Sequence, residues 1–509
     1  MPTRRALLAA GMALALPGRL RAQTGFRRYP FTLGVASGEP LPDGVVLWTR
    51  LAPEPLAGGG MPMQPLAVRW EVASDGGMNR IVQAGEAIAP PELGHSVHVE
   101  VAGLEPGQDC RYRFTVGTER SQVGRTAPRP RAGLAGRAPA LRRCRLSALR
   151  RRFYRLPPSC RRAFRFRFHY GDYIYEYRLR QPGEPGAPLA RTHDADEAYT
   201  LVDYRNRYAL YKLDPDLQRA HASAPFLMSY DDHEVDNNWA NDIDQDNTDP
   251  ALFLLRRAAA FQAYYEHMPL SRAMLLPGAD LRLYRRLVFG DLLAVHVLDT
   301  RRFRTDQPCG DGGQARCPAA IDPRATMLGA EQERWLLEGL AASATRWNTL
   351  AQQVMMMQRD RDPDPQRGRY EMDKWDGYVA ARQRLLNFFQ ERRIAPVVLA
   401  GDAHSHYAGN LLADFDAPDA PIVGAEFVGT SITSNGDGSD TRPDTPVLLA
   451  ANPHIKFFND QRGYLSIEVT PARWITHFRT VDYVSRPGAP LATRASFAVE
   501  AGVAGVKPA

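Results

Sequence analysis

Three short apolar segments of this chain run directly into clusters of carboxylate, phenol and imidazole side chains. The clusters are Asp172 and Tyr175 after "FHY", Asp231, Asp232, His233 and Glu234 after "FLMSY", and Asp402, His404 and His406 after "VVLAG". In layered α/β proteins, the loops after the carboxyl ends of strands carry the chemistry. Oxygen and imidazole ligands suit a hard cation or ferric iron better than a thiolate cage does. A single cluster would be read as a helix cap or a structural histidine, but three clusters predict a metal site.

The chain beyond residue 168 alternates apolar strands with helices. The expected strands lie in "FLMSYDDHE", "LLAVHVLDTRRFR", "TLAQQVM" and "APVVLAGDAHSHYA", and the expected helices span 329–343 and 379–392. This alternation is typical of an α/β or α+β domain built in layers.

Residues 31–128 have an all-β pattern instead. The runs "GVVLWTRL", "LAVRWEVAS", "HSVHVEVAGL" and "CRYRFTVG" are short, rich in Val, Trp and Tyr, and separated by Gly, Pro and Asp turns. The turn and strand in "GLEPGQDCRYRF" are typical of fibronectin-III-like sandwiches. We therefore predict a β-sandwich, followed by a linker at "APRPRAG".

The N-terminus has the features of an export signal. Arg4 and Arg5 precede an apolar run over 6–16, and the small residue Ala22 follows at a plausible cleavage point. The run is too short to span a bilayer, and the paired arginines favour the twin-arginine route over an ordinary Sec signal. That route carries folded proteins. We expect a signal over 1–22, the twin-arginine translocase as an export partner, and a periplasmic or secreted protein.

Two of the five cysteines lie close together in one loop. Cys309 and Cys317 belong to the Gly-rich segment "QPCGDGGQARCP". In an exported protein this arrangement predicts a disulfide, and the alternative is two free thiols.

The formal net charge of +7 has a local origin. Residues 142–167 contain eleven arginines, no lysine and no acid, so the rest of the chain carries −4 (7 − 11). The block lacks lysine, Gly/Ser spacing and any recognisable nucleic-acid-binding fold. We therefore expect no nucleic-acid partner. An Arg-rich insert that binds nucleic acid remains the alternative, to be decided by a salt-dependent binding measurement.

Motifs along nearly the whole chain after the signal support one family. They are "GVASGEPLPDGVVLWTRL", "GDYIYEY", "YDDHEVDNNWA", "LDTRRFRTDQPCGDG", "KWDGYVAARQRLL", "LAGDAHSHYAGN", "EFVGTSITSNG" and "HIKFFNDQRGYLSIEVT". Together they resemble the alkaline phosphatase D (PhoD) family of exported phosphoesterases. The resemblance implies a four-layer calcineurin-like metallophosphoesterase sandwich over 132–495, behind an all-β fibronectin-III-like domain over 26–128. It also implies an active site with Fe³⁺ and Ca²⁺.

The resemblance assigns roles to individual residues. Asp172 would bridge the metals, and Tyr175 would bind ferric iron as a phenolate, with His404 facing the iron. The calcium-side ligands or neighbours would be Asp232, Asn237 and Asp402. His233 would contact the transferring phosphoryl group.

The implied reaction is hydrolysis of a phosphate ester by a metal-activated hydroxide. Arg301 and Arg304 in "DTRRFR" are candidates to hold phosphate oxygens by bidentate contacts, or else they form ion pairs within the protein. Glu234 is expected to support the ligands. The sequence leaves phosphomonoesterase, phosphodiesterase and phospholipase D-type activity open, and an inactive binding module is the remaining alternative. We expect a monomer.

One element of the family is missing. The catalytic domain of the family opens with a strand that ends in a Ser/Ala-Cys-Gln motif, whose cysteine binds iron, and the Arg block occupies that place. If one nucleotide is lost before Leu141 and the frame returns near Phe168, the shifted frame can encode "FAVVACQRYEGGFIAYRHLAAEPFDFVF". We therefore interpret 141–168 as out of frame, with a true Arg-rich insert as the alternative. Cys144 is not assigned as a ligand.

The Arg block also leads to a structural expectation. Buried strands of a parallel sheet need an apolar run, and "LRRCRL" would bury guanidinium groups. We therefore expect this segment to leave the sheet, or the sheet to lose an edge.

Overall fold

The computed structural model describes residues 26–131, 144–149, 164–178, 193, 196–278, 280–362, 364, 367–417, 419–434 and 436–509. For 144–149, 164 and 165 it describes the backbone alone. The expected signal over 1–22 and most of the Arg block lie outside the described residues. Within the described part, no helix combines the length and hydropathy that a membrane span requires.

The N-terminal part consists of short strands in two sheets. One sheet contains β1 (Val35–Gly38), β2 (Val45–Arg50) and β5 (Ser96–Val101); the other contains β3 (Leu66–Ala73), β4 (Ile81–Ala89), β6 (Cys110–Val116), β7 (Glu119–Arg120) and β8 (Gly124–Thr126). Side chains of β6 alternate between buried and half-buried, as expected for a strand with one face on a core. The core between the sheets includes Leu47, Val68 and Tyr112. All four strands expected here are present.

The first of these sheets continues into the rest of the molecule. Its strand β1 also pairs with β11 (Phe226–Met228), which joins it to a ten-stranded sheet in the order β26-β25-β24-β23-β9-β10-β11-β1-β2-β5. The remaining strands of this sheet are β9 (Cys144–Leu149), β10 (Phe164–His169), β23 (Arg462–Val469), β24 (Arg473–Val481), β25 (Leu491–Glu500) and β26 (Lys507–Pro508).

A second large sheet contains seven strands in the order β14-β15-β17-β19-β21-β20-β22. They are β14 (Arg285–Phe289), β15 (Leu293–Val297), β17 (Trp347–Ala351), β19 (Val397–Ala400), β20 (His406–Leu412), β21 (Ile422–Val428) and β22 (Ile455–Asn459). Strands β15, β17, β19 and β21 run parallel to their neighbours in this series. Phe168 of β10 and Val297 of β15 share one hydrophobic core, so the two sheets pack face to face.

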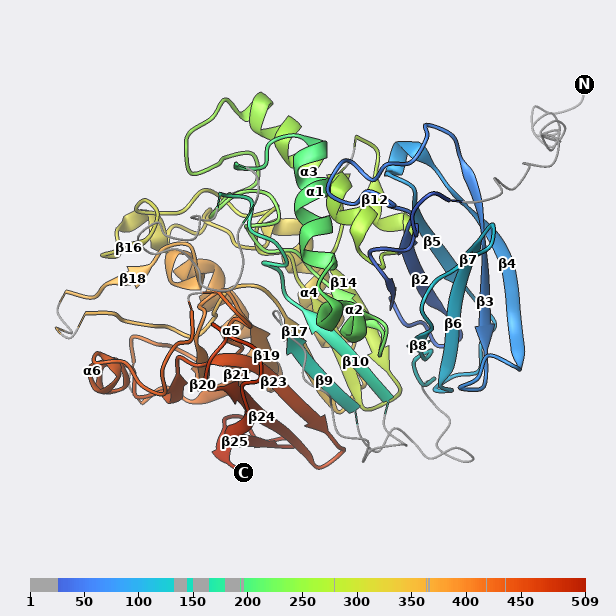
Figure 1. Ribbon diagram of the computed structural model, residues 1–509. Helices are drawn as coiled ribbons and strands as arrows, with labels where there is room; N and C mark the ends of the chain where they lie inside the picture. The colour runs from blue at the N-terminus through green and yellow to red at the C-terminus, as the bar shows by residue number, and fades with distance from the viewer. Residues whose placement is uncertain are drawn as a thin grey trace, which may run out of the picture.

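Helices cover the outer faces of both large sheets (Figure 1). Helices α1 (Leu201–Lys212), α2 (Pro215–His221) and α3 (Pro250–His267) share a core with β11, and α4 (Gly329–Ala341) and α5 (Val379–Arg392) share another with β17 and β19. These helices and the two sheets form the four layers that the family resemblance implies.

Short elements complete the fold. They are α6 (Thr445–Ala451), the strands β12 (Leu275–Leu276), β13 (Asp280–Leu281), β16 (Gly313–Gln314) and β18 (Tyr370–Glu371), and 3₁₀ turns at Pro91–Leu93, Arg272–Met274, Pro318–Ile321 and Trp375–Gly377.

The position of β9 corrects one expectation. Cys144–Leu149 forms a strand inside the ten-stranded sheet, parallel to β10 and antiparallel to β23. The prediction that this segment leaves the sheet, or costs the sheet an edge, is therefore wrong. The physical reason is that a sheet ladder is made by backbone N–H and C=O groups, which every residue except proline supplies in full. Strands β10 and β23 both need a partner, and the backbone of β9 satisfies both.

Candidate metal centre

The three sequence clusters meet where the two large sheets end. Asp172 follows β10, the segment 229–241 follows β11, and Asp402 and His404 follow β19. Asp402, His404 and Asp172 have left-handed backbone conformations, with φ values of 61°, 53° and 50°, respectively. This region is sparsely populated by residues other than glycine, and such strain concentrates at functional sites.

Asp172, Tyr175 and His404 surround one point. The Tyr175 hydroxyl lies 3.2 Å from Asp172 Oδ2 and 3.1 Å from His404 Nε2. The distance from His404 Nε2 to Asp172 Oδ2 is 3.8 Å. Ser434 Oγ donates a hydrogen bond of 2.9 Å to the Tyr175 oxygen from the opposite loop. A carboxylate, a phenol and an imidazole, the three groups expected on the iron side, are therefore adjacent.

A second group of ligand atoms adjoins the first. Single ligand atoms of Asp231, Asp232 and Asp402 lie within 4.8 Å of one another, as do those of Asp172, Asp232 and His233. Asp232 belongs to both sets and so connects them. Burial opposes ionisation of Asp232, but Arg301 and His233 outweigh burial and hold its pKa below its usual range.

The ligand atoms of this second group are suited to a bound cation. Among the described residues, no group donates a hydrogen bond to Asp231 Oδ2 or Asp232 Oδ1, although both atoms are buried. Leaving buried carboxylate oxygens without donors is costly. A divalent or trivalent cation would satisfy both oxygens at once, and oxygen-rich sets of this kind suit hard cations. We therefore regard these residues as a metal centre.

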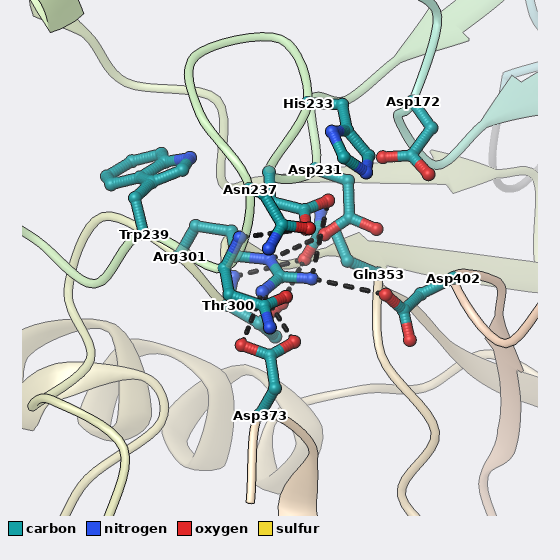
Figure 2. A network of polar contacts seen from close by, with 12 residues as sticks. Asp172, Asp231, His233, Asn237, Trp239, Thr300, Arg301, Gln353, Asp373 and Asp402 are labelled. Atoms are coloured by element: carbon teal, nitrogen blue, oxygen red, sulfur yellow. Dashed lines mark hydrogen bonds and ion pairs between the residues drawn. The ribbon is translucent and has the colours of Figure 1, made fainter. Parts of the chain in front are cut away.

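Asn237 lies beside Asp231 in Figure 2. Its amide nitrogen donates 2.5 Å to Gln245 Oε1, and its backbone N–H donates 2.9 Å to Glu176 Oε1. The side-chain amide of Asn237 therefore contacts Gln245, and its role as a calcium neighbour stays a prediction.

His233 is oriented by a carboxylate that sequence reasoning missed. Its Nδ1 lies 2.7 Å from Glu176 Oε2, and its ring centroid lies 4.3 Å from that of Tyr175. Figure 2 shows the imidazole next to Asp172. Glu176 also accepts the Asn237 N–H, so one carboxylate connects the loop after β10 to the loop after β11. The available signal was an acid inside the aromatic run "GDYIYEY".

Glu234 supports the ligands through their backbone. Its Oε2 accepts from the N–H groups of Asp172 at 3.0 Å and Asp231 at 2.8 Å, and its Oε1 accepts from Tyr173 N. Burial raises the pKa of Glu234 to about 8, against these hydrogen bonds. The same two loops approach closely at Gly171, whose φ is 119°. A Cβ at Gly171 would lie 2.1 Å from Asp231 N, so only glycine fits there.

The two arginines expected to hold substrate are instead committed to the protein. Arg301 Nε lies 2.6 Å from Asp231 Oδ1, and its Nη1 lies 2.9 and 2.7 Å from the two oxygens of Asp373. Arg304 donates to the Asp373 carboxylate at 2.7 Å and to backbone carbonyls. Both side chains are 0% exposed. We therefore place Arg301 and Arg304 in the ion-pair network of the site rather than on the substrate. Figure 2 shows Arg301 between Asp231 and Asp373.

His406, in the third cluster, also faces away from the centre. Its Nδ1 accepts from Thr430 N at 3.2 Å, and its ring packs 5.0 Å from that of Phe478. Burial lowers the pKa of His406 to about 3, so this histidine is a neutral core residue.

Cys309 and Cys317 form a disulfide bond. The loop that it closes contains Asp311, whose carboxylate accepts from Asn238 Nδ2 at 3.0 and 2.8 Å. Asn238 N donates in turn to Asp232 Oδ2 at 3.1 Å. The disulfide loop is therefore one hydrogen-bonded residue away from a metal-site carboxylate.

Comparisons with known proteins agree with this geometry. Residues 154–478 match the model of the PhoD-like phosphatase family, and residues 17–130 match that of its N-terminal domain. Alkaline phosphatase D of Bacillus subtilis (strain 168) is 46% identical over 492 residues, which cover 96% of this chain and 84% of that protein.

Two solved structures agree at the level of the fold. A structure of PhoD superposes with a TM-score of 0.89 at 45% identity, covering 95% of this chain and 93% of the other. The purple acid phosphatase PPD1 from yellow lupin (Lupinus luteus) seeds has a TM-score of 0.54 at 11% identity, covering 92% of this chain and 73% of the other. The second likeness shows a shared fold.

Proposed function

The chain belongs to the PhoD-like phosphatase family, and we propose that it is a metal-dependent alkaline phosphatase or phosphodiesterase that acts at the centre formed by its three strand-end loops. The observation that carries this proposal is the convergence of Asp172, Asp232 and His233, whose ligand atoms lie within 4.8 Å of one another. Carboxylates that hold cations beside an imidazole suit hydrolysis of a phosphate ester.

We assign Fe³⁺ to the side of Asp172, Tyr175 and His404. Phenolate and imidazole donors beside a carboxylate suit ferric iron. Ca²⁺ is assigned to the side of Asp232, Asn237 and Asp402, because ligand sets made up of oxygen atoms suit calcium. When bound, the metals would supply Lewis-acid neutralisation of charge and lower the pKa of water.

The residues of the chain would position the substrate and move the proton. His233 lies between the two ligand groups, where it can hold or deliver a proton at the leaving-group oxygen. Glu176 fixes the orientation of the imidazole, because its carboxylate lies within hydrogen-bond distance of His233 Nδ1. Glu234 holds the loop after β10 against the loop after β11, because its carboxylate accepts hydrogen bonds from the N–H groups of Asp172 and Asp231.

The proposal includes the biological setting expected from the sequence. The paired Arg4 and Arg5 support export by the twin-arginine translocase, and a disulfide suits a periplasmic or secreted location. In that setting the enzyme would release phosphate from external esters for phosphate acquisition. We propose that it acts as a monomer and binds no nucleic acid.

Hydrolysis of chromogenic substrates tests the proposal. We expect the frame-restored protein, loaded with iron and calcium, to hydrolyse a nitrophenyl phosphomonoester or a bis(nitrophenyl) diester at alkaline pH, and the chain with the printed sequence to be impaired because it lacks the cysteine ligand. A chelator should remove the activity, and returning the metals should restore it. A metal-loaded, frame-restored protein that hydrolyses neither ester would refute the proposal. The ratio of the two rates separates a monoesterase from a diesterase.

A further inference from the structure

Lys374 is a cation beside the metal centre for which the mechanism above has no role. It comes from the motif "KWDGYVAARQRLL", and its ammonium group contacts Asp402 Oδ2. Asp402 is one of the three carboxylates whose oxygens lie within 4.8 Å of one another. The ammonium is therefore placed at the edge of the ligand group.

Exposure distinguishes this lysine from the neighbouring arginines. The side chains of Arg301 and Arg304 are 0% exposed, whereas that of Lys374 is 13% exposed. The guanidinium groups are committed to Asp231 and Asp373. Of these three cations, only Lys374 keeps part of its side chain exposed to solvent.

The backbone around Lys374 is anchored on both sides. On one side, the Asp373 carboxylate is held by Arg301 at 2.7 Å and Arg304 at 2.7 Å. On the other, the Trp375 indole N–H donates 2.9 Å to Gln352 Oε1. The lysine side chain therefore extends from a fixed point, which lowers the entropic cost of placing its charge.

The ammonium group has the donors that a phosphate ligand needs. It carries three N–H donors and acts as a compact point charge, the form in which lysine binds phosphate. Asp402 has a second cationic neighbour, because its Oδ1 lies 3.4 Å from Arg301 Nη2. The ammonium can thus serve an incoming phosphate oxygen without leaving Asp402 unpaired.

We propose that Lys374 binds a non-bridging oxygen of the substrate phosphate, and of the phosphate product, at the edge of the metal centre. This role rests on the proposed function and gives the site a partly exposed cation, which Arg301 and Arg304 do not provide. No covalent bond forms or breaks at the lysine.

Calorimetric titration of the metal-loaded full chain with inorganic phosphate tests the proposal independently of turnover. We expect Lys374→Met to raise the dissociation constant of phosphate about 10- to 100-fold, as for a lost charged hydrogen bond, with unchanged metal content. Lys374→Arg should restore part of the affinity. Lys456→Met, at an exposed lysine whose ammonium donates to Pro453 O, is the matched control and should match the wild type.

Three outcomes would overturn the proposal. The first is wild-type affinity in Lys374→Met, and the second is no measurable phosphate binding by the wild-type chain. The third is loss of metal in parallel with loss of phosphate affinity, which would make the lysine a counter-ion of Asp402 alone. Failure of the proposed function would give a different result. A chain that hydrolyses neither ester, but whose phosphate affinity still depends on Lys374, would contradict the proposed function and not the role of the lysine in phosphate binding.

Discussion

At the scale of single residues, the site depends on side chains that serve two neighbours at once. Asp172 and Asp232 each belong to more than one ligand contact, and Glu176 and Glu234 each connect two loops. Substitution of such a residue should therefore have larger effects than loss of one contact, because two groups lose their partner together.

Asp172 gives the most direct prediction at this scale. Asp172→Asn should abolish both turnover and bound metal, because a neutral amide cannot balance the charge of two cations. Metal content by elemental analysis and hydrolysis of a chromogenic ester measure the two losses. Asp291→Asn, at an exposed aspartate, is the control and should retain both. A fully metallated Asp172→Asn protein would contradict the bridging role.

His233 should separate catalysis from metal binding. We expect His233→Ala to lower kcat by roughly 100-fold or more, the size of a lost general acid, while the metals stay bound. Glu176→Gln should lower kcat less and change the pH profile of kcat, since His233 Nδ1 loses its carboxylate partner. Equal losses and unchanged pH profiles in both variants would show that the contact between Glu176 and His233 has no catalytic role.

At the scale of elements, the loop closed by Cys309 and Cys317 is connected to the metal site by Asp311 and Asn238. Replacing both cysteines with serine should lower the free energy of unfolding by about 2 kcal/mol, from the entropy of a short closed loop. It should also weaken metal retention, because Asn238 loses a fixed partner. Denaturant titration and metal analysis measure these effects, with Cys110→Ala as the control for a cysteine outside the disulfide.

Mass mapping of the non-reduced protein tests the bond itself. Material recovered from the periplasm in which both Cys309 and Cys317 are alkylated would exclude the disulfide.

Strand β9 gives the second prediction at this scale. Its backbone completes the sheet, but the frame hypothesis predicts that the genomic DNA of codons 135–170 shows a one-base slip relative to a frame encoding Ala-Cys-Gln. A protein with the restored frame should bind more iron than the chain with the printed sequence, because it regains a thiolate ligand. It should also hydrolyse a phosphate ester at least roughly 100-fold faster. Equal iron content and equal turnover in the two proteins would make the cysteine irrelevant. Stop codons in the shifted frame would end the hypothesis.

At the scale of the whole molecule, the layered core should make stability depend on pH through Glu426 in β21. This buried carboxylate accepts from Met356 N at 2.8 Å and Met357 N at 2.6 Å, and burial raises its pKa from 4.5 to about 7. The folded protein therefore holds a proton that the unfolded chain loses above pH 4.5. Its contribution is fully present below pH 4.5 and is lost as pH rises to about 7.

We expect the free energy of unfolding to fall by about 3 kcal/mol across this pH window because of Glu426. Glu426→Gln should flatten the decrease, because the amide does not ionise. Glu391→Gln, at an exposed position of α5, should leave it unchanged. Denaturant unfolding at several pH values measures the slope, and an identical slope in Glu426→Gln would contradict the prediction.

Much of the fold could be predicted from the sequence. The strands β2, β3, β5, β6, β15 and β19 and the helices α4 and α5 lie where apolar runs and turn residues predict them, because local pattern decides which backbone segments can bury one face. The chemical types gathered in the site, carboxylate, phenol and imidazole, were also predicted. Each directly follows a strand, so its place at a sheet edge depends on the strand alone.

Only the tertiary structure decides which side chains from distant parts of the chain contact one another. The sequence suggested substrate contacts for Arg301 and Arg304, but packing buries both guanidinium groups against Asp231 and Asp373. It offered no means of pairing Glu176 with His233. It also predicted that the Arg-rich segment would leave the sheet or cost the sheet an edge, although the backbone ladder of β9 forms between β10 and β23. A local pattern determines which segments can form strands, whereas the burial and partner of a charge depend on residues far away in the chain.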